Sequence, residues 1–376
     1  MKIIKPLFLS LVAAIFLNSC SNDELQVPVY TPLGSYDSGV LVLNEGSFGS
    51  SNSSVSFISF DLNTAQNDIF KVVNPALVLG DVAQSIGFNG ELAYIVVNNS
   101  NKIQIVNRYT MVNVGTITTG LNNPRYIAFA NGKGFVTNWG TTTFTGPEPT
   151  PDDFIAVINL SSNTVTSTIP VIEGPERIIA NGSNLYVSHK GGYSYGNKLS
   201  IINGATNTLL STINVSDLPS TMQINNGSLW VLCEGNPNYA PTETTGKLLK
   251  INLATNQITD TFNFNSPTNH PSNLEIYNNS VYYTIESRVY KMSLTPVGQA
   301  TSISLPLTPI YTSSLANLYG FAVKSNRLYI SGFNSFGSVG QVNVHSLGEL
   351  AGSPSIGTIQ KTVNVGIGPN GFYFNQ

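Results

Sequence analysis

The stretch GIGPNGFYFNQ, residues 366–376, contains an apolar strand that starts at a proline. The same arrangement occurs in NNPRYIAFANG (122–132), EGPERIIANG (173–182), DLPSTMQINNG (217–227) and NHPSNLEIYNN (269–279). Each of those four segments is followed by further strand-like segments, but Gln376 is the last residue. We therefore expect residues 366–376 to supply the first strand of a repeat whose other strands lie elsewhere in the chain.

The internal repeat is defined by an aromatic-centred strand that follows each proline-type strand. Six copies occur in order: ELAYIVVNN, GKGFVTNWG, SNLYVSHKGG, GSLWVLCEGN, NSVYYTIES and NRLYISGFN. Two more short strands complete each unit, and helical periodicity is almost absent. The starting position of the unit recurs at Val82, Pro124, Pro175, Pro219, Pro271, Leu318 and Pro369. These intervals of roughly 40 to 50 residues, with four short strands in each, are typical of propeller blades.

The partner strands for residues 366–376 are expected near the other end of the chain. GVLVLNEGS (39–47), SVSFISFDLNT (54–64) and NDIFKVV (67–73) have the patterns of a second, third and fourth strand with no first strand before them. The sequence therefore predicts an all-β, seven-bladed propeller of four-stranded blades over residues 38–376. Its ring would be closed by the C-terminal strand joining the N-terminal strands, with Phe372 near Val42, which removes exposed sheet edges. A β-solenoid is the alternative, but it would leave the last strand without a partner.

The composition excludes one class of partner. Hydrophobic residues make up 41% of the 376 residues and charged residues only 10%, with a formal net charge of −3. No run of Lys or Arg could neutralise a phosphate backbone, so nucleic acid is not expected as a partner.

The first 19 residues have the layout of a secretory signal peptide. Lys2 and Lys5 precede an apolar run from Leu7 to Leu17 that is too short to span a bilayer. The run ends in LNSC, which resembles a bacterial lipobox and implies lipidation of Cys20; an ordinary signal cut elsewhere is the alternative. SNDE, residues 21–24, resembles the signal that directs Bacteroidetes lipoproteins to the cell surface. We therefore expect an outer-membrane protein that faces the cell exterior and contacts the membrane only through its lipid anchor.

Residues 20–37 are predicted to form a flexible tether, because they contain Pro and Ser without a sustained strand pattern. With Cys20 assigned to lipidation, Cys233 has no partner for an intramolecular disulfide. Its place near the end of a strand pattern favours a buried small hydrophobe over a reactive thiol.

The repeat resembles that of a known family. INLSSNTVTSTIPV (158–171) is similar to the signature of YVTN-repeat, or YncE-like, seven-bladed propellers, and the resemblance covers Gly39–Gln376. LVLNEGSFGSSNSSVSFI, LGDVAQSI, IVVNNSNKIQIVN and NNPRYIAF resemble BtuG-type surface lipoproteins of Bacteroidetes. The resemblance implies capture of cobalamin and its delivery to a TonB-dependent outer-membrane transporter, but it identifies no individual binding residue.

Aligning the blades predicts which side chains surround the axis on one face of the propeller. These are residues at the start of each innermost strand and just after each second strand, together with His189 beside them. The predicted ligand-binding residues are Glu45, Gln84, Asn98, Arg125, Tyr126, Trp139, Glu176, Arg177, His189, Lys190, Glu234, Asn273, Glu286, Tyr319, Phe333 and Asn370. Aromatic rings beside amides suit a large, nearly neutral ligand such as a corrinoid, and in part a carbohydrate.

Three alternatives remain open from the residues alone. Arg125, Glu176 and Arg177 could pair across neighbouring blades and only fix their register. The protein could be a carbohydrate-binding or adhesive surface module. A lyase is the third alternative, with Glu234 or Glu286 and His189 or His270 as an acid–base pair. Neither a metal site nor a cofactor is expected, because the three histidines are far apart in sequence.

Overall fold

The computed structural model describes residues 31–141, 152–294, 308–348 and 356–376. Contacts divide the chain into two units, Met1–Pro32 and Leu33–Gln376, and the description that follows concerns the second. The predicted signal peptide, Cys20 and most of the predicted tether lie outside the described residues.

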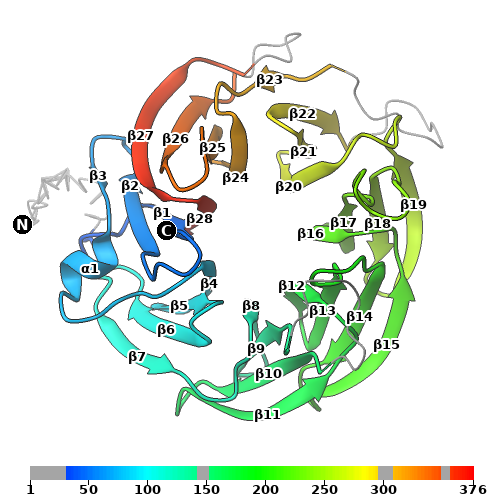
Figure 1. Ribbon diagram of the computed structural model, residues 1–376, viewed down its shortest axis with the longest axis horizontal. Coiled ribbons are helices and arrows are strands. Elements are labelled where there is room, and N and C mark those ends of the chain that lie inside the picture. Colours follow the sequence, from blue (N-terminus) through cyan, green and yellow to red (C-terminus); the bar gives the residue numbers. More distant parts are fainter. Residues whose placement is uncertain (1–30, 142–151, 295–307, 349–355) are drawn as a thin grey trace, which may run out of the picture. The chain divides into compact units, whose positions relative to one another are not determined.

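The unit Leu33–Gln376 is an all-β propeller of seven four-stranded antiparallel sheets, as the sequence predicts (Figure 1). Strands β28, β4, β8, β12, β16, β20 and β24 lie innermost, around the axis. From the axis outward, the first four blades are β28 (Pro369–Asn375), β1 (Gly39–Asn44), β2 (Ser54–Ser59) and β3 (Ala65–Gln66); β4 (Ala83–Asn89), β5 (Leu92–Val97), β6 (Lys102–Asn107) and β7 (Asn113–Ile117); β8 (Pro124–Ala130), β9 (Lys133–Asn138), β10 (Phe154–Asn159) and β11 (Thr164–Pro170); β12 (Pro175–Asn181), β13 (Asn184–His189), β14 (Lys198–Asn203) and β15 (Thr208–Asn214).

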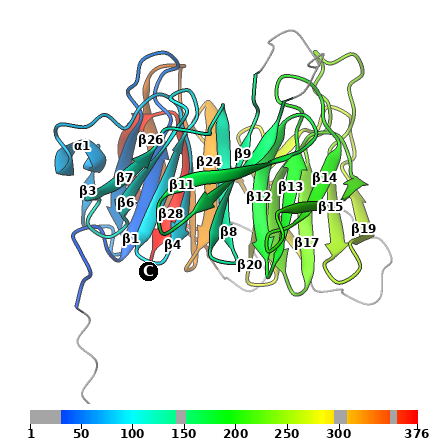
Figure 2. The same ribbon diagram turned by 90° about the horizontal axis from the view of Figure 1, so that it is seen from below.

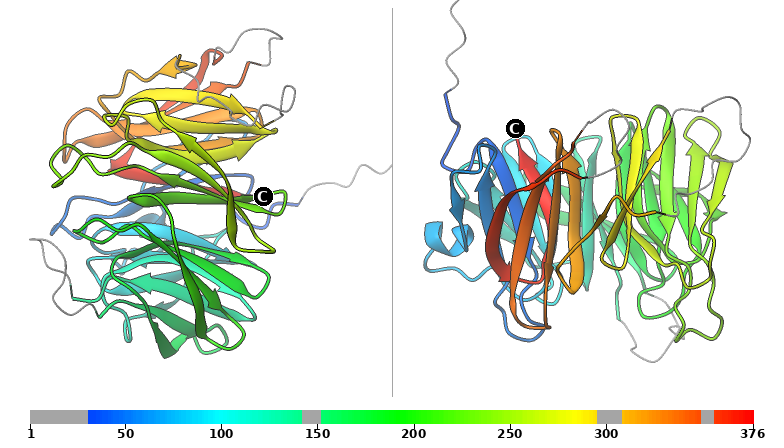
Figure 3. Two further views of the ribbon diagram at one scale, coloured as in Figure 1. Left: turned by 90° about the vertical axis from the view of Figure 1, so that its right-hand side faces the viewer. Right: turned by 90° about the horizontal axis from the view of Figure 1, so that it is seen from above.

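The other three blades repeat this order. They are β16 (Pro219–Asn225), β17 (Ser228–Cys233), β18 (Lys247–Asn252) and β19 (Gln257–Asn263); β20 (Pro271–Tyr277), β21 (Ser280–Ile285), β22 (Arg288–Ser293) and β23 (Tyr311–Thr312); β24 (Asn317–Lys324), β25 (Arg327–Phe333), β26 (Val339–Ser346) and β27 (Ile359–Ile367). Apolar side chains from adjacent blades pack face to face and form the core between them. Side views show the strands running between two edges at which the loops gather (Figures 2 and 3).

The ring closes between the two ends of the chain, as predicted. β28 pairs antiparallel with β1, and Val42 lies opposite Phe372. Phe372 and Phe374 pack against the buried Val40 and Val42 and against Tyr329 of the neighbouring blade. The closing strand therefore joins two blades through apolar contacts as well as through its own ladder.

Asn375 fixes the end of the closing strand. Its side chain is fully buried, and its amide donates to the main-chain oxygens of Tyr36 (2.8 Å) and Arg108 (2.7 Å). Its side-chain oxygen accepts from Nε of Arg108 (2.7 Å), and the Arg108 guanidinium also donates to the main-chain oxygen of Phe374 (2.8 Å). One asparagine thus links the closing strand to the adjacent blade and to the segment that leads into β1.

One strand prediction is wrong. The segment NDIFKVV contains the short helix α1 (Ile69–Val73), and the fourth strand of this blade is only the two residues of β3. Helical geometry brings the consecutive residues Ile69 and Phe70 into the core, where both are fully buried, whereas a strand would turn one of them outward. Figure 2 shows α1 at the outer side of the blade, near β3.

Two further features of the described residues bear on the sequence analysis. None of their helices has the length and apolar character needed to cross a bilayer. Cys233 is fully buried and free, and burial raises the pKa of its thiol to about 12. The thiol therefore has the character of a small core hydrophobe.

Deleting Pro369–Gln376 is expected to abolish cooperative folding of the propeller, because the deletion opens the ring and exposes the edge of β1. The finer variant Asn375→Ala should lower the free energy of unfolding by about 1–3 kcal/mol, because it leaves buried carbonyl oxygens without donors. Denaturant and calorimetric unfolding measure both effects. Asn263→Ala, at the exposed end of β19, is the matched control and should change stability little. Only a small local loss on deletion would contradict the closure.

Candidate functional site

Irregular strand pairing builds the site. In every blade the ladder between the innermost strand and the second strand is interrupted at the start of the innermost strand. A β-bulge releases residues from the ladder and redirects their side chains. Residues skipped in this way include Gln84, Arg125, Tyr126, Glu176, Arg177, Ser220, Asn273, Tyr319 and Asn370. All of these except Ser220 belong to the predicted site.

Buried hydroxyl groups on the second strands stabilise the bulges. Thr137 Oγ1 accepts from the backbone N–H of Tyr126 (2.9 Å) and donates to the main-chain oxygen of Glu176 (2.8 Å). Ser188 Oγ accepts from the backbone N–H of Arg177 (3.2 Å), and Ser331 Oγ donates to the main-chain oxygen of Pro369 (2.7 Å). These hydroxyl groups pair backbone groups that the interrupted ladder would otherwise leave without partners.

The bulged residues surround an axial cavity of about 410 Å³, here called the mouth. Nine of its lining residues belong to the predicted site: Gln84, Arg125, Tyr126, Glu176, Arg177, Lys190, Glu234, Asn273 and Tyr319. Ser220, Thr221, His270, Ser272 and Leu318 complete it. The structure therefore brings residues from six blades to one polar cavity on the axis.

Two ion pairs at the mouth join neighbouring blades. Arg125 binds Glu176 through two hydrogen bonds, Nε to Oε2 (3.0 Å) and Nη2 to Oε1 (2.9 Å), and its guanidinium lies over Trp139. Burial opposes both charges, yet each partner stabilises the other, so that the pKa of Glu176 is lowered and the pKa of Arg125 is raised. Lys190 Nζ donates one hydrogen bond to Oε2 of Glu234 across the next junction (2.8 Å).

Hydrogen bonds from neutral donors continue these contacts across other blades. Tyr319 Oη donates to Oε2 of Glu45 (2.7 Å), and the Asn370 amide donates to Oε1 of Glu45 (2.9 Å) and to the main-chain oxygens of Ala83 and Gln84. Burial raises the pKa of Glu45, although these hydrogen bonds and the charge of Arg125 oppose the rise. The Gln84 amide in turn donates to Tyr126 Oη (3.0 Å).

A second cavity of about 170 Å³, here called the inner cavity, lies next to the mouth. The two cavities share Gln84, Tyr126, Arg177, Thr221 and Asn273, which form the neck between them. The inner cavity also contacts Gln223, Glu275, Asn370 and Tyr373. Glu275 accepts from the Gln223 amide (2.7 Å), and burial raises its pKa to about 7.

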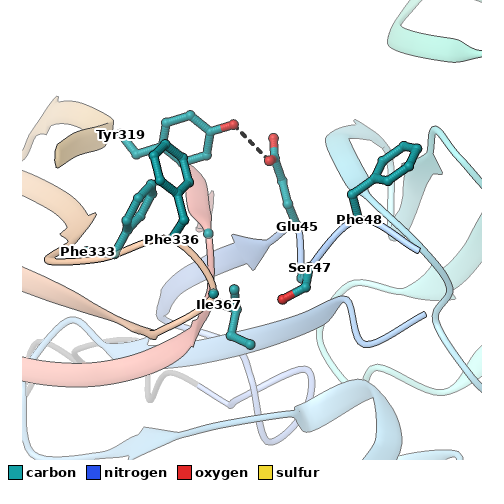
Figure 4. A pocket seen from close by; sticks show the side chains of 10 residues that line it. Glu45, Ser47, Phe48, Tyr319, Phe333, Phe336 and Ile367 are labelled. Atoms are coloured by element: carbon teal, nitrogen blue, oxygen red, sulfur yellow. Dashed lines mark hydrogen bonds between the residues drawn. The ribbon is translucent and has the colours of Figure 1, made fainter. Parts of the chain in front are cut away.

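A third cavity, here called the rim cleft, lies beside the mouth and has a volume of about 420 Å³. Figure 4 shows Tyr319, Phe333 and Phe336 on one side of it and Phe48 on the other, with Glu45 between them. Phe48 is 71% exposed and Phe336 is 89% exposed. Tyr319 lines both the rim cleft and the mouth, so that the aromatic and polar regions are continuous.

Four predicted site residues line none of these cavities. Asn98 donates to the main-chain oxygen of Pro124, Trp139 contacts Arg125 and Tyr193, and Glu286 pairs with Arg288 in an exposed turn. His189 is 1% exposed and bonds Ser200 Oγ (2.8 Å) inside its blade. Burial lowers the pKa of His189 to about 4, which keeps it neutral.

The sequence analysis missed several residues that contact the cavities. Phe48 and Phe336 lie in the loops GSFGSSNS and GFNSFGS, where their exposure could not be read from any repeat position. Gln223 and Glu275 are two residues further along their strands than the aligned neck positions. Residues two apart on a strand point to the same side, so this spacing could have identified them. Among the described residues, no group of three or more His, Cys, Asp or Glu could hold a metal ion.

Removing one member of the Arg125–Glu176 pair should destabilise the protein more than removing both. Arg125→Met or Glu176→Gln alone leaves a buried group without its partner, and we expect each to lower the free energy of unfolding by about 3–5 kcal/mol. Arg125→Met combined with Glu176→Gln should cost much less than the sum of the two single changes. The same cycle at the exposed Lys250–Asp260 pair is the control, with an expected coupling below about 1 kcal/mol. Additive effects at Arg125 and Glu176 would show that the pair does not couple the blades.

Known structures resemble this chain in fold. The periplasmic gluconolactonase of Pseudomonas aeruginosa is 11% identical with a TM-score of 0.65, covering 90% of this chain and 99% of that one. A hypothetical selenium-binding protein from Sulfolobus tokodaii is 7% identical with a TM-score of 0.62, covering 88% and 92%. Hydrazine synthase of Kuenenia stuttgartiensis is 17% identical with a TM-score of 0.57, covering 78% and 92%. At these identities the likeness concerns the fold alone.

The comparison with curated proteins found no match. A family model does match the chain over residues 38–365, which is most of its length and nearly all of the propeller. The chain therefore belongs to the family described as the domain of unknown function DUF5074.

Proposed function

We propose that the protein captures a small or medium ligand on the axis face of the propeller and passes it to a TonB-dependent outer-membrane transporter, with cobalamin or a related corrinoid as the preferred ligand. The observation that supports this most directly is the continuity of the polar mouth with the aromatic rim cleft through Tyr319. A ligand that lies across both would meet hydrogen-bonding groups and exposed rings on one surface.

The shape and chemistry of the face suit a corrinoid. A corrin ring has an apolar face and carries amide groups at its edge. It would lie across the openings of both cavities, with Phe48 and Phe336 beside its apolar face and its amides above the mouth. Because bulges and inter-blade contacts already hold the mouth in place, binding would require little ordering of the protein.

Further support comes from the direction of the strands and from the sequence resemblances. Pro369 lies opposite Asn44 in the closing pair, so β28 starts at the axis face and β1 starts at the opposite face. The chain therefore enters the propeller on the side away from the cavities. The BtuG-type segments and the predicted lipidation at Cys20 support delivery to a transporter at the outer membrane.

Titration of the purified protein with cyanocobalamin by calorimetry tests the preferred ligand. Phe48→Ala combined with Phe336→Ala should weaken binding about tenfold, because two aromatic contacts are lost. Leu210→Ala, at a half-exposed position on the outer strand β15, is the control and should bind as the unchanged protein does. No binding at micromolar protein would remove corrinoids from the proposal.

A carbohydrate-binding or adhesive role is the second candidate, and the exposed Phe48 and Phe336 favour it, because flat rings in an open cleft also suit sugar rings. A glycan panel titrated in parallel separates the two ligands.

His270 lines the mouth, with Nδ1 3.0 Å from the main-chain oxygen of Glu234 and Nε2 3.4 Å from Glu243. Ligand turnover that His270→Ala abolishes would favour a lyase instead; His189 is too deeply buried to act on a ligand there.

Membrane attachment is expected to depend on Cys20. Cys20→Ser should move the protein from the membrane fraction to the soluble fraction, because the lipid would be its only anchor. Fractionation of cells measures this, with Cys233→Ser as the matched cysteine control that should leave the distribution unchanged. A variant at Cys20 that remains fully membrane-bound would contradict lipidation there, and digestion of intact cells by external protease tests exposure at the surface.

A further inference from the structure

The neck is formed by five hydrogen-bonding side chains, each from a different blade. Gln84, Tyr126, Arg177, Thr221 and Asn273 lie near the starts of β4, β8, β12, β16 and β20, which surround the axis in Figure 1. The equivalent positions on the remaining two blades are Gly320 and Gly371, which have no side chain. The five provide amide, hydroxyl and guanidinium donors, and none of them is a carboxylate.

Arg177 differs from the other cations of the mouth. Arg125 and Lys190 are each bonded to a carboxylate, at 2.9 and 2.8 Å. Among the described residues, no carboxylate oxygen lies within 4.0 Å of the Arg177 guanidinium, although the charge of Arg177 acts on Glu176 and Glu275 from a greater distance. It lies over the ring of Tyr126, 4.0 Å from the ring centroid. Stacking uses one face of the guanidinium and leaves its N–H groups free.

We propose that the neck is an oxyanion site, in which Arg177 binds a carboxylate or phosphate group of a ligand while neutral donors around the axis complete the contact. A guanidinium matches the geometry of either oxyanion and can bind it through two hydrogen bonds. Thr221 and Tyr126 provide hydroxyl groups, and Asn273 provides an amide. This inference rests on the proposed function only in placing a ligand on the axis face.

The carboxylate of Glu275 makes the site dependent on pH. Glu275 lines the inner cavity below the neck and accepts one hydrogen bond, from Gln223. The charged groups that act on it are Arg177 and Lys324, and the phenols of Tyr126 and Tyr373 line the same cavity. Its pKa of about 7 means that it is neutral in acid and charged in base. Above that pH its negative charge compensates Arg177 and repels a bound oxyanion.

The test compares two aromatic anions with a neutral aromatic amide. Benzoate and phenyl phosphate are titrated into the purified protein by calorimetry, with benzamide as the neutral analogue, at about pH 5.5, where Glu275 is mostly neutral. We expect at least one of the two anions to bind and benzamide to bind at least about tenfold more weakly; the tighter of the two identifies the group that the neck prefers. Arg177→Gln should weaken binding of the anion by about tenfold or more. Arg288→Gln, at an exposed arginine, should leave the affinity for the anion unchanged.

Raising the pH to about 8.5 should weaken binding of benzoate about tenfold. This corresponds to a rise of about one unit in the pKa of Glu275 when the anion binds. Glu275→Gln should remove most of that dependence on pH. Equal binding of benzoate and benzamide, failure of both anions to bind, or unchanged anion affinity in a folded Arg177→Gln protein would overturn the inference. A protein that binds benzoate but not cyanocobalamin would keep the oxyanion site and reject the corrinoid, and the reverse result would reject the oxyanion site alone.

Discussion

The pairing of β28 with β1 is the interaction on which the rest of the propeller depends. It is the only ladder that joins the two ends of the described propeller, and it places Val42 opposite Phe372. Without it one blade would lack its innermost strand, and the axis would lose Asn370, Gly371, Phe372 and Tyr373, which line the inner cavity. Buried hydrogen bonds from Asn375 and Arg108 fix the end of this strand. Fold closure and site geometry therefore share one physical cause.

The bulges at the starts of the innermost strands turn polar side chains of a regular repeat toward the axis. A continuous ladder would turn alternate residues into the spaces between blades, where apolar residues are needed for packing. Interrupting it turns polar residues such as Arg177 toward the axis, while hydroxyl groups of Thr137 and Ser188 bond the freed backbone. Because each blade repeats the same interruption, the polar residues meet at one level on the axis. The side chains at these positions can then differ from blade to blade while the backbone of the bulge stays the same.

The sequence was sufficient for the blades, their order and the closing pair, because strand patterns and the proline position recur in each repeat. It also identified most lining residues of the mouth, since equivalent positions of a repeat meet around an axis. It failed where a residue departs from the repeat: α1 replaces most of an outer strand to bury Ile69 and Phe70, and Phe48 and Phe336 lie in loops of individual length. His189 was misplaced because it is the last residue of its strand, where the side chain turns into the blade and not toward the axis.

The charged side chains on the axis face are of two kinds: those paired between blades and those that are not. Two ion pairs cross blade junctions, Arg125 with Glu176 and Lys190 with Glu234. Each pair holds its two side chains in place and has no net charge. Glu45 is held by hydrogen bonds from Tyr319 and Asn370. Arg177 is stacked on Tyr126 in the neck, and Glu275 below it carries a charge that depends on pH. Arg177 is a partly buried cation without a bonded carboxylate, whereas Arg125 and Lys190 beside it are each paired with one. That contrast is the physical basis of the proposal that Arg177 binds a ligand, while the surrounding ion pairs join neighbouring blades.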